Sequence, residues 1–89
     1  MSDAGRVRIE FPCDYPVKIV GDGAEDFRML VEEVVERHAA GFARQLTTTR
    51  YSSGGRYMSV TVTIVATGSE QLQALFEDLK ATGRVQMVL

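Results

Sequence analysis

The chain has 89 residues, which is enough for one domain with a modest hydrophobic core. Its 45% hydrophobic and 25% charged residues are typical of a globular protein, and its net charge of −2 provides no general attraction to nucleic acid or to an anionic membrane. No apolar run approaches the roughly 20 residues that cross a bilayer, and the first residues lack the apolar region of an export signal, so a cytoplasmic location is expected.

The first third of the chain predicts an arm, a strand and a helix. Residues 1–14 show no clear hydrophobic period and are interpreted as a flexible N-terminal arm, which leaves 15–89 as the single domain. Segment 15–21 is rich in β-branched residues and ends at a glycine, which predicts a strand with Pro16 at its start. From 22 to 41, apolar residues recur at helical spacing, acidic residues precede them and basic residues follow, as expected of a helix.

The remaining elements are read from the same two periods. The threonine-rich segment 43–52 predicts a weaker strand, and segment 56–66 predicts a strong one because apolar and polar residues alternate along it. Helical spacing returns from 69 to 83, where Ser69 is a typical residue to precede a first helical turn. The last six residues, RVQMVL, predict a short closing strand.

This order of elements predicts an α+β ferredoxin-like βαββαβ sandwich, a four-stranded antiparallel sheet with two helices on one face. Right-handed crossovers are expected to place the first and third strands side by side and parallel. The other face of the sheet would have no helix over it. That open face is the candidate interaction surface, and its predicted members are Val20, Thr61, Thr63 and Val65. The register of the second strand remains open, and a purely solvated face, self-association as a homodimer and docking of a partner protein are all compatible with this pattern.

Two glycine-containing segments invite comparison with phosphate-binding loops. Gly54 and Gly55 lie between two predicted strands with no lysine after them, so they are interpreted as a hairpin turn. The loop between the first strand and the first helix is the candidate ligand-binding site, and it consists of Gly21, Asp22, Gly23 and Ala24. Its acidic surroundings would repel a phosphate, which leaves a neutral or cationic group as the ligand.

Residues for catalysis and metal binding are sparse. His38 is the only histidine, so one chain cannot form a histidine-based metal cluster, and no nucleophile is evident beside it in the sequence. The single cysteine, Cys13, has no partner for an internal disulfide, and its acidic neighbours disfavour a reactive thiolate. We therefore predict a protein that is not an enzyme and that has no cofactor and no metal.

Nucleic-acid binding needs a separate test because RNA-recognition domains share this topology. Those domains stack bases on aromatic residues of the two central strands, whereas here only Tyr57 is expected on the outer face of segment 56–66. Arg44, Arg50 and Arg56 form a small basic patch at most, and charges that protect a sheet edge explain them equally well. Nucleic acid is not an expected partner.

Four stretches of the sequence resemble the YbeD-like family of small bacterial proteins: YPVKIVG, VVERHAAG, SSGGRYMSVTVTIVAT and QLQALFEDLKATGRVQMVL. The resemblance runs from about Phe11 to Leu89. It implies a ferredoxin-like, ACT-domain-like fold, a molecular function that is not established, and a suggested link to lipoate metabolism. Ala40, Phe42 and Gly54 depart from the residues that members often have, which puts in doubt any function tied to charge at those loops.

Two functions follow as hypotheses. The first is a non-enzymatic regulatory or protein-interaction module that acts through the open sheet face or the loop at Gly21. The second comes from the likeness to ACT domains, which bind amino acids between subunits near the loop after the first strand. It is small-molecule sensing, of an amino acid or an acyl compound, at Gly21–Ala24.

Overall fold

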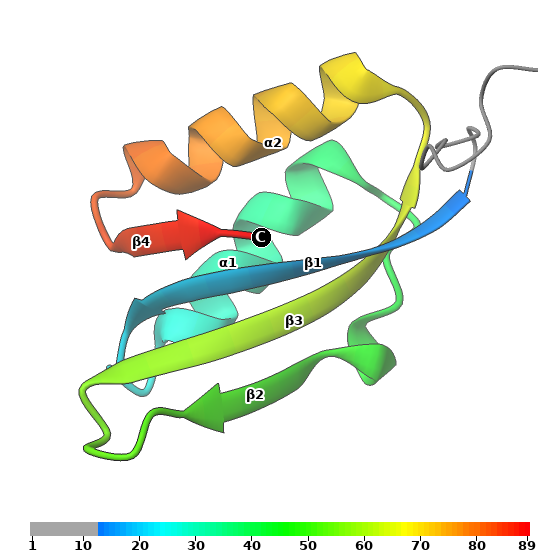
Figure 1. The fold of residues 1–89 in the computed structure, drawn as a ribbon. Coiled ribbons are helices and arrows are strands. Elements are labelled where there is room, and N and C mark those ends of the chain that lie inside the picture. Colours follow the sequence, from blue (N-terminus) through cyan, green and yellow to red (C-terminus); the bar gives the residue numbers. More distant parts are fainter. Residues whose placement is uncertain (1–12) are drawn as a thin grey trace, which may run out of the picture.

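The computed structural model describes residues 13–89 of the chain. It confirms the predicted order of elements (Figure 1). The elements are β1 Cys13–Asp22, α1 Phe27–His38, the short 3-10 helix η1 Arg44–Leu46, β2 Thr48–Tyr51, β3 Tyr57–Ala66, α2 Ser69–Ala81 and β4 Val85–Val88. Strand β1 begins two residues before the predicted strand, and residues 1–12 of the predicted arm lie outside the described residues.

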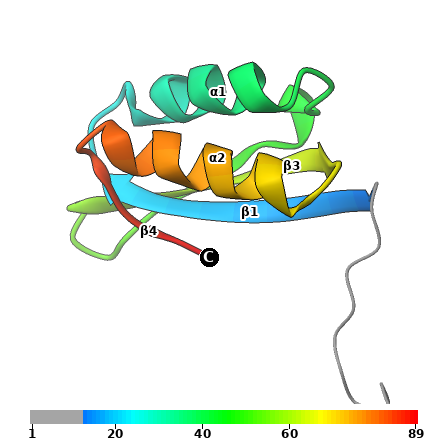
Figure 2. The same ribbon diagram turned by 90° about the horizontal axis from the view of Figure 1, so that it is seen from above.

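The four strands form one sheet in the order β2-β3-β1-β4, and every neighbouring pair is antiparallel. The expectation that the first and third strands run parallel is therefore wrong. The crossover through α1 makes β1 and β2 parallel, and the hairpin then reverses the chain, so that β3 enters between them in the opposite direction. Both helices cover the same face of the sheet (Figure 2), as predicted.

The hydrophobic core lies between this sheet face and the helices. Alternate residues of β3 from Met58 to Ala66 are buried, and their register brings Val62 opposite Val17 and Val60 opposite Ile19 of β1. The side chains that the helices contribute to this layer are Phe27, Val31, Val34, Val35, Leu72, Leu75 and Leu79. Apolar side chains that recur every two residues in the strands and every 3.6 residues in the helices thus pack into one layer. The polar residues of β3 lie on the face without helices.

Two elements differ in their bounds from the prediction, and in both places an ion pair fixes the backbone. Helix α1 begins at Phe27 rather than residue 22, because β1 continues to Asp22, whose carboxylate bonds to Arg84, and residues 23–26 form the loop that follows. The predicted strand at 43–52 is also shorter, since its first part forms η1. There Arg44 donates hydrogen bonds to two carboxylates of α1, at 2.9 Å and 2.7 Å, and this contact between distant segments outweighs local strand propensity.

Pro16 is the fourth residue of β1 rather than its first, and its position has a physical reason. The backbone N–H and C=O of Lys18 both bond to Leu89, at 3.2 Å and 2.8 Å. Because backbone direction repeats every two residues, Pro16 faces the same edge, beyond the end of β4. Its missing N–H donor therefore leaves no ladder bond unmade.

Candidate functional site

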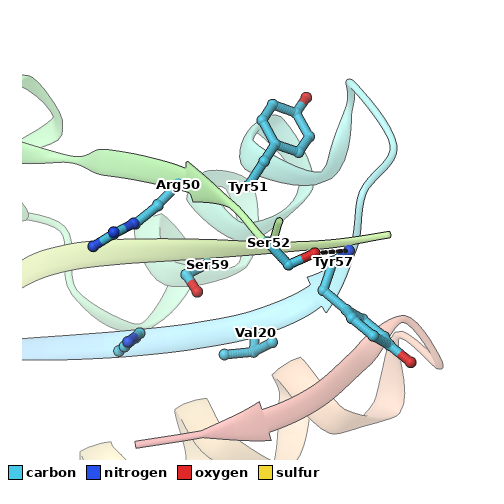
Figure 3. Close-up of a pocket in the computed structure, with 7 residues that line it drawn as sticks. Val20, Arg50, Tyr51, Ser52, Tyr57 and Ser59 are labelled. Atoms are coloured by element: carbon cyan, nitrogen blue, oxygen red, sulfur yellow. Dashed lines mark hydrogen bonds between the residues drawn. The ribbon is translucent and has the colours of Figure 1, made fainter. Parts of the chain in front are cut away.

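The face of the sheet without helices carries a shallow hollow of about 370 Å³, where β1, β2 and β3 meet the β2–β3 hairpin. Its lining residues are Lys18, Val20, Arg50, Tyr51, Ser52, Tyr57 and Ser59. Figure 3 shows Val20, Ser59 and Arg50 across three neighbouring strands, with Tyr57 to one side and the Tyr51 ring turned away. We call this the open-face hollow.

Sheet register brings these side chains together. Ser59 of β3 is opposite Val20 on one side and opposite Arg50 on the other, which makes one row across the sheet. Lys18 lies in the next row, opposite Thr61. Because residues two apart share a face and the intervening β3 residues are buried under the helices, this whole set must face away from the core.

The two cations of the hollow have no described carboxylate beside them, in contrast to Arg28, Arg44 and Arg84, which each form ion pairs. Lys18 and Arg50 are exposed, and no carboxylate of residues 13–89 forms an ion pair with either. Ser52, Tyr57 and Ser59, which each carry a hydroxyl, line the same hollow, and the Ser52 hydroxyl accepts a hydrogen bond from the Tyr57 backbone N–H at 3.1 Å. Cationic and hydroxyl donors in one depression can bind an anionic group such as a carboxylate.

The four predicted members of the open face all lie on that face, but only one of them lines the hollow. Val20 lines the hollow, whereas Thr61, Thr63 and Val65 continue along β3 outside it, with Val65 42% exposed. Sequence reasoning missed Lys18, Arg50 and Ser59 as members of one site. The alternation of apolar and polar residues in β1 and β3 indicated the face of Lys18 and of Ser59. The face of Arg50 depends on the register of β2.

The predicted ligand-binding loop is occupied by contacts within the protein. The Asp22 carboxylate accepts hydrogen bonds from Arg84 Nε at 2.7 Å and Nη2 at 2.9 Å, and from the Ala24 backbone N–H at 3.2 Å. Asp26 accepts another from Arg84 Nη2 at 2.8 Å. Hydrogen bonds from Arg84 lower the pKa of Asp22 and of Asp26, and in turn they raise the pKa of Arg84. We call these three residues the Arg84 cluster.

The glycines of that loop allow close packing. A Cβ added at Gly21 would overlap the Phe27 ring, and one at Gly23 would overlap the carbonyl oxygen of Gly55. The Gly23 backbone N–H also donates to the Arg56 carbonyl at 3.1 Å, so the loop rests against the β2–β3 hairpin. Gly55 itself has a φ of 70°, which suits the hairpin turn predicted there. Ligand binding at Gly21–Ala24 stays a prediction.

His38 lies on the helical side of the molecule, at the end of α1. Its Nε2 is 2.9 Å from the Asp78 Oδ2 of α2, and its backbone carbonyl accepts a hydrogen bond from Gln71 Nε2 at 2.9 Å. These contacts join the two helices. Among residues 13–89, no group of three or more histidine, cysteine, aspartate or glutamate residues is arranged to hold a metal ion, and no helix is long and apolar enough to span a membrane.

This chain matches a family whose function is unknown. The family described as "Protein of unknown function (DUF493)" matches residues 7–89. A UPF0250 protein of Azotobacter vinelandii is 52% identical over 89 residues, which cover 99% of this chain and 97% of the relative. A UPF0250 protein of Hahella chejuensis is 43% identical over 82 residues, with 92% and 90% covered.

Solved structures support the fold. The solution structure of protein HP0495 from H. pylori superposes with a TM-score of 0.71 over 100% of this chain and 93% of that one, at 15% identity. A second solution structure of HP0495 gives a TM-score of 0.61 at 18% identity, with 99% and 98% covered. Identity this low shows a shared fold and carries no residue roles.

Proposed function

We propose, from the premise that this chain belongs to the DUF493 family of proteins of unknown function, that it is a non-enzymatic regulatory module which binds a partner protein through the open face of its sheet. The observation that carries the proposal is the open-face hollow, with two cations that no described carboxylate neutralises. The anionic group that these cations recognise would be a carboxylate side chain of the partner.

The distribution of charge supports this direction of approach. The two helices hold six acidic side chains, Glu32, Glu33, Glu36, Glu70, Glu77 and Asp78, against three basic ones, Arg28, Arg37 and Lys80. An acidic partner is therefore repelled from the helical side and attracted to the hollow, although the protein as a whole is acidic. Once the partner excludes water, a hydrogen bond between charged groups contributes about 1.5–3 kcal/mol.

The chemistry of the hollow suits binding better than catalysis. Its seven lining residues include no carboxylate, imidazole or thiol, which are the groups that most often serve as general bases or activated nucleophiles. Its hydroxyls and cations are donors, and all of these residues except Ser52 lie on strands. The suggested link to lipoate metabolism and the ACT-like sensing role stay predictions, since a ligand at Gly21–Ala24 would first have to displace Arg84 from Asp22.

The test compares two double variants with the same change of charge. The double variant Lys18→Glu, Arg50→Glu reverses the charge of the hollow. The double variant Arg37→Glu, Lys80→Glu reverses the charge at two exposed positions of the helices. Each tagged protein is used to capture partners from the lysate of the native organism. We expect a protein that the wild type and the helical variant both recover and that the hollow variant loses. Equal recovery by the two variants would contradict the proposal.

A further inference from the structure

The outer edge of β2 carries backbone groups directed away from the sheet. The Ser52 backbone N–H donates to the Tyr57 carbonyl at 2.9 Å, so Ser52 faces β3. Since direction alternates, Arg50 and Thr48 also face β3, while the N–H and C=O groups of Thr49 and Tyr51 face outward. Figure 1 shows no described segment along the outer side of β2.

We propose that this edge accepts an extended segment of the partner protein as a fifth strand, and that the segment carries an acidic residue opposite Arg50. The inference rests on the proposed function, because the added strand would lie at the margin of the open-face hollow. Backbone hydrogen bonds to Thr49 and Tyr51 would supply affinity, and side chains at alternate positions would supply specificity.

The side chains of β2 define the pattern of the segment. Arg50 is on the open face, so the residue opposite it also lies there, beside its guanidinium group. Tyr51 and Thr49 are on the other face, and two residues of the added strand would lie against them. Tyr51 is 51% exposed at one end of β2, and Leu46 is 54% exposed before the other. The partner segment therefore has one acidic residue between two apolar ones.

A second copy of this chain fits the edge less well. Antiparallel pairing of two β2 strands requires their outward residues to face each other, which places another Arg50, Thr48 or Ser52 opposite Arg50. The first arrangement opposes like charges, and the other two leave the charge unpaired. Arg50 thus discourages edge-to-edge self-pairing and still admits an acidic strand.

The opposite edge of the sheet is less suitable. Along β1 beyond the end of β4, Pro16 removes one of the donors that a new strand would need. Strand β4 itself pairs with β1 through a register shift between Val20 and Gly21. Among the described residues, β2 is the edge strand that pairs without a register shift and that carries a cation.

The probe is the heptapeptide acetyl-Ser-Thr-Val-Glu-Val-Thr-Ser-amide, titrated into isotope-labelled protein and followed by amide NMR and hydrogen exchange. We expect saturable binding, with slower exchange of the Thr49 and Tyr51 amides. Lysine in place of glutamate in the peptide should weaken binding roughly tenfold by replacing an attraction with a repulsion. A peptide with both valines N-methylated keeps its charge, loses the strand hydrogen bonds and should not bind.

Two sets of protein variants distinguish the contribution of the backbone hydrogen bonds at the β2 edge from that of the Arg50 charge. Thr49→Pro removes an outward donor without removing a bond to β3 and should abolish binding, whereas Thr49→Val keeps the donor and should bind normally. Arg50→Glu should reverse the preference, binding the lysine peptide more tightly than the glutamate peptide. This exchange of preference tests the pairing even if Thr49→Pro fails to fold.

Three results would overturn the inference. If the N-methylated peptide binds as well as the unmodified one, the hollow attracts charge without strand addition, and the proposed function survives. If no acidic peptide binds while the lysate partner still requires Lys18 and Arg50, the fifth strand is wrong and the function again survives. If the protein forms a dimer that buries Thr49 and Tyr51 and that excludes the peptide, the occupant is a second copy.

Discussion

The Arg84 cluster and the open-face hollow use positive charge in opposite ways. Arg84 lies between two carboxylates at hydrogen-bond distance and over the Phe27 ring, 5.8 Å from its centroid. Lys18 and Arg50 lie on the open face with no such partner among residues 13–89. The same small domain therefore holds cations that join segments of its own chain, as Arg84 and Arg44 do, and cations on the open face that no described carboxylate pairs.

The difference indicates where a binding function should be sought in this protein. A charge that is already paired contributes to the fold, and a ligand must compete with the existing partner for it. An unpaired charge on a rigid sheet contributes little to folding and can be used in recognition. Variants that damage the fold and variants that damage binding should consequently fall in different places.

The largest effect on stability is expected at Gly21, near the end of β1 and next to Asp22 of the Arg84 cluster. In Gly21→Ala the added Cβ overlaps the Phe27 ring and lies 2.6 Å from the Arg84 carbonyl oxygen, so β1, α1 and β4 must move apart. We expect a loss of roughly 2–3 kcal/mol in the free energy of unfolding, measured by urea denaturation. Gly54→Ala is the matched control, because a Cβ there meets nothing within 4 Å. Equal stability of the two variants would refute the close packing.

Removal of the paired cation should have a smaller but clear effect. Arg84→Met keeps an apolar stem over Phe27 and removes the Arg84 hydrogen bonds to the carboxylates of Asp22 and Asp26. The urea midpoint of Arg84→Met should fall below that of Arg50→Met, which loses no described ion pair. If Arg50→Met proved the less stable variant, the division between the two regions would be wrong.

The pH dependence sharpens the same contrast. Hydrogen bonds from Arg84 lower the pKa of Asp22 and Asp26 in the folded protein. Their contribution is therefore present above the unfolded-state pKa of about 4 and is lost as the pH falls through the lower folded-state values. The stability advantage of wild type over Arg84→Met should shrink between pH 7 and pH 2. An advantage that grew on acidification would contradict the assignment.

The smallest effect on stability is expected in the hollow. Lys18→Met and Arg50→Met replace exposed cations that form no ion pair within residues 13–89, and each should change the free energy of unfolding by less than about 0.5 kcal/mol. Partner capture or peptide binding by the same variants should nevertheless fall. A large destabilisation would show that these cations serve the fold.

Hydrophobic periodicity predicted the elements well because it depends on the nearest layer of packing. The alternation in 56–66 was sufficient to assign β3, its buried face and its polar face, and the two amphipathic segments identified the helices. The errors occurred where distant residues intervene. Arg44 forms part of η1 because it reaches two carboxylates of α1, and the start of α1 moves because Asp22 pairs with Arg84.

The candidate site shows the same division. Lys18 and Ser59 could be assigned to the open face from the alternation of their own strands, but Arg50 could not, since β2 has four exposed residues and no burial pattern to orient it. Its pairing with Ser59 comes from the hairpin register, which the turn between Ser52 and Tyr57 determines. The local composition of β2 does not indicate that register.

By itself, the amino-acid sequence determined which segments are strands and helices, that both helices lie on one side of the sheet, and that the reverse side is uncovered, because each follows from the period of apolar residues along the chain. Only the tertiary structure decided which cations are neutralised and which remain available. Ion pairing depends on distances between residues as far apart as Asp22 and Arg84, and no local pattern in the sequence encodes such distances.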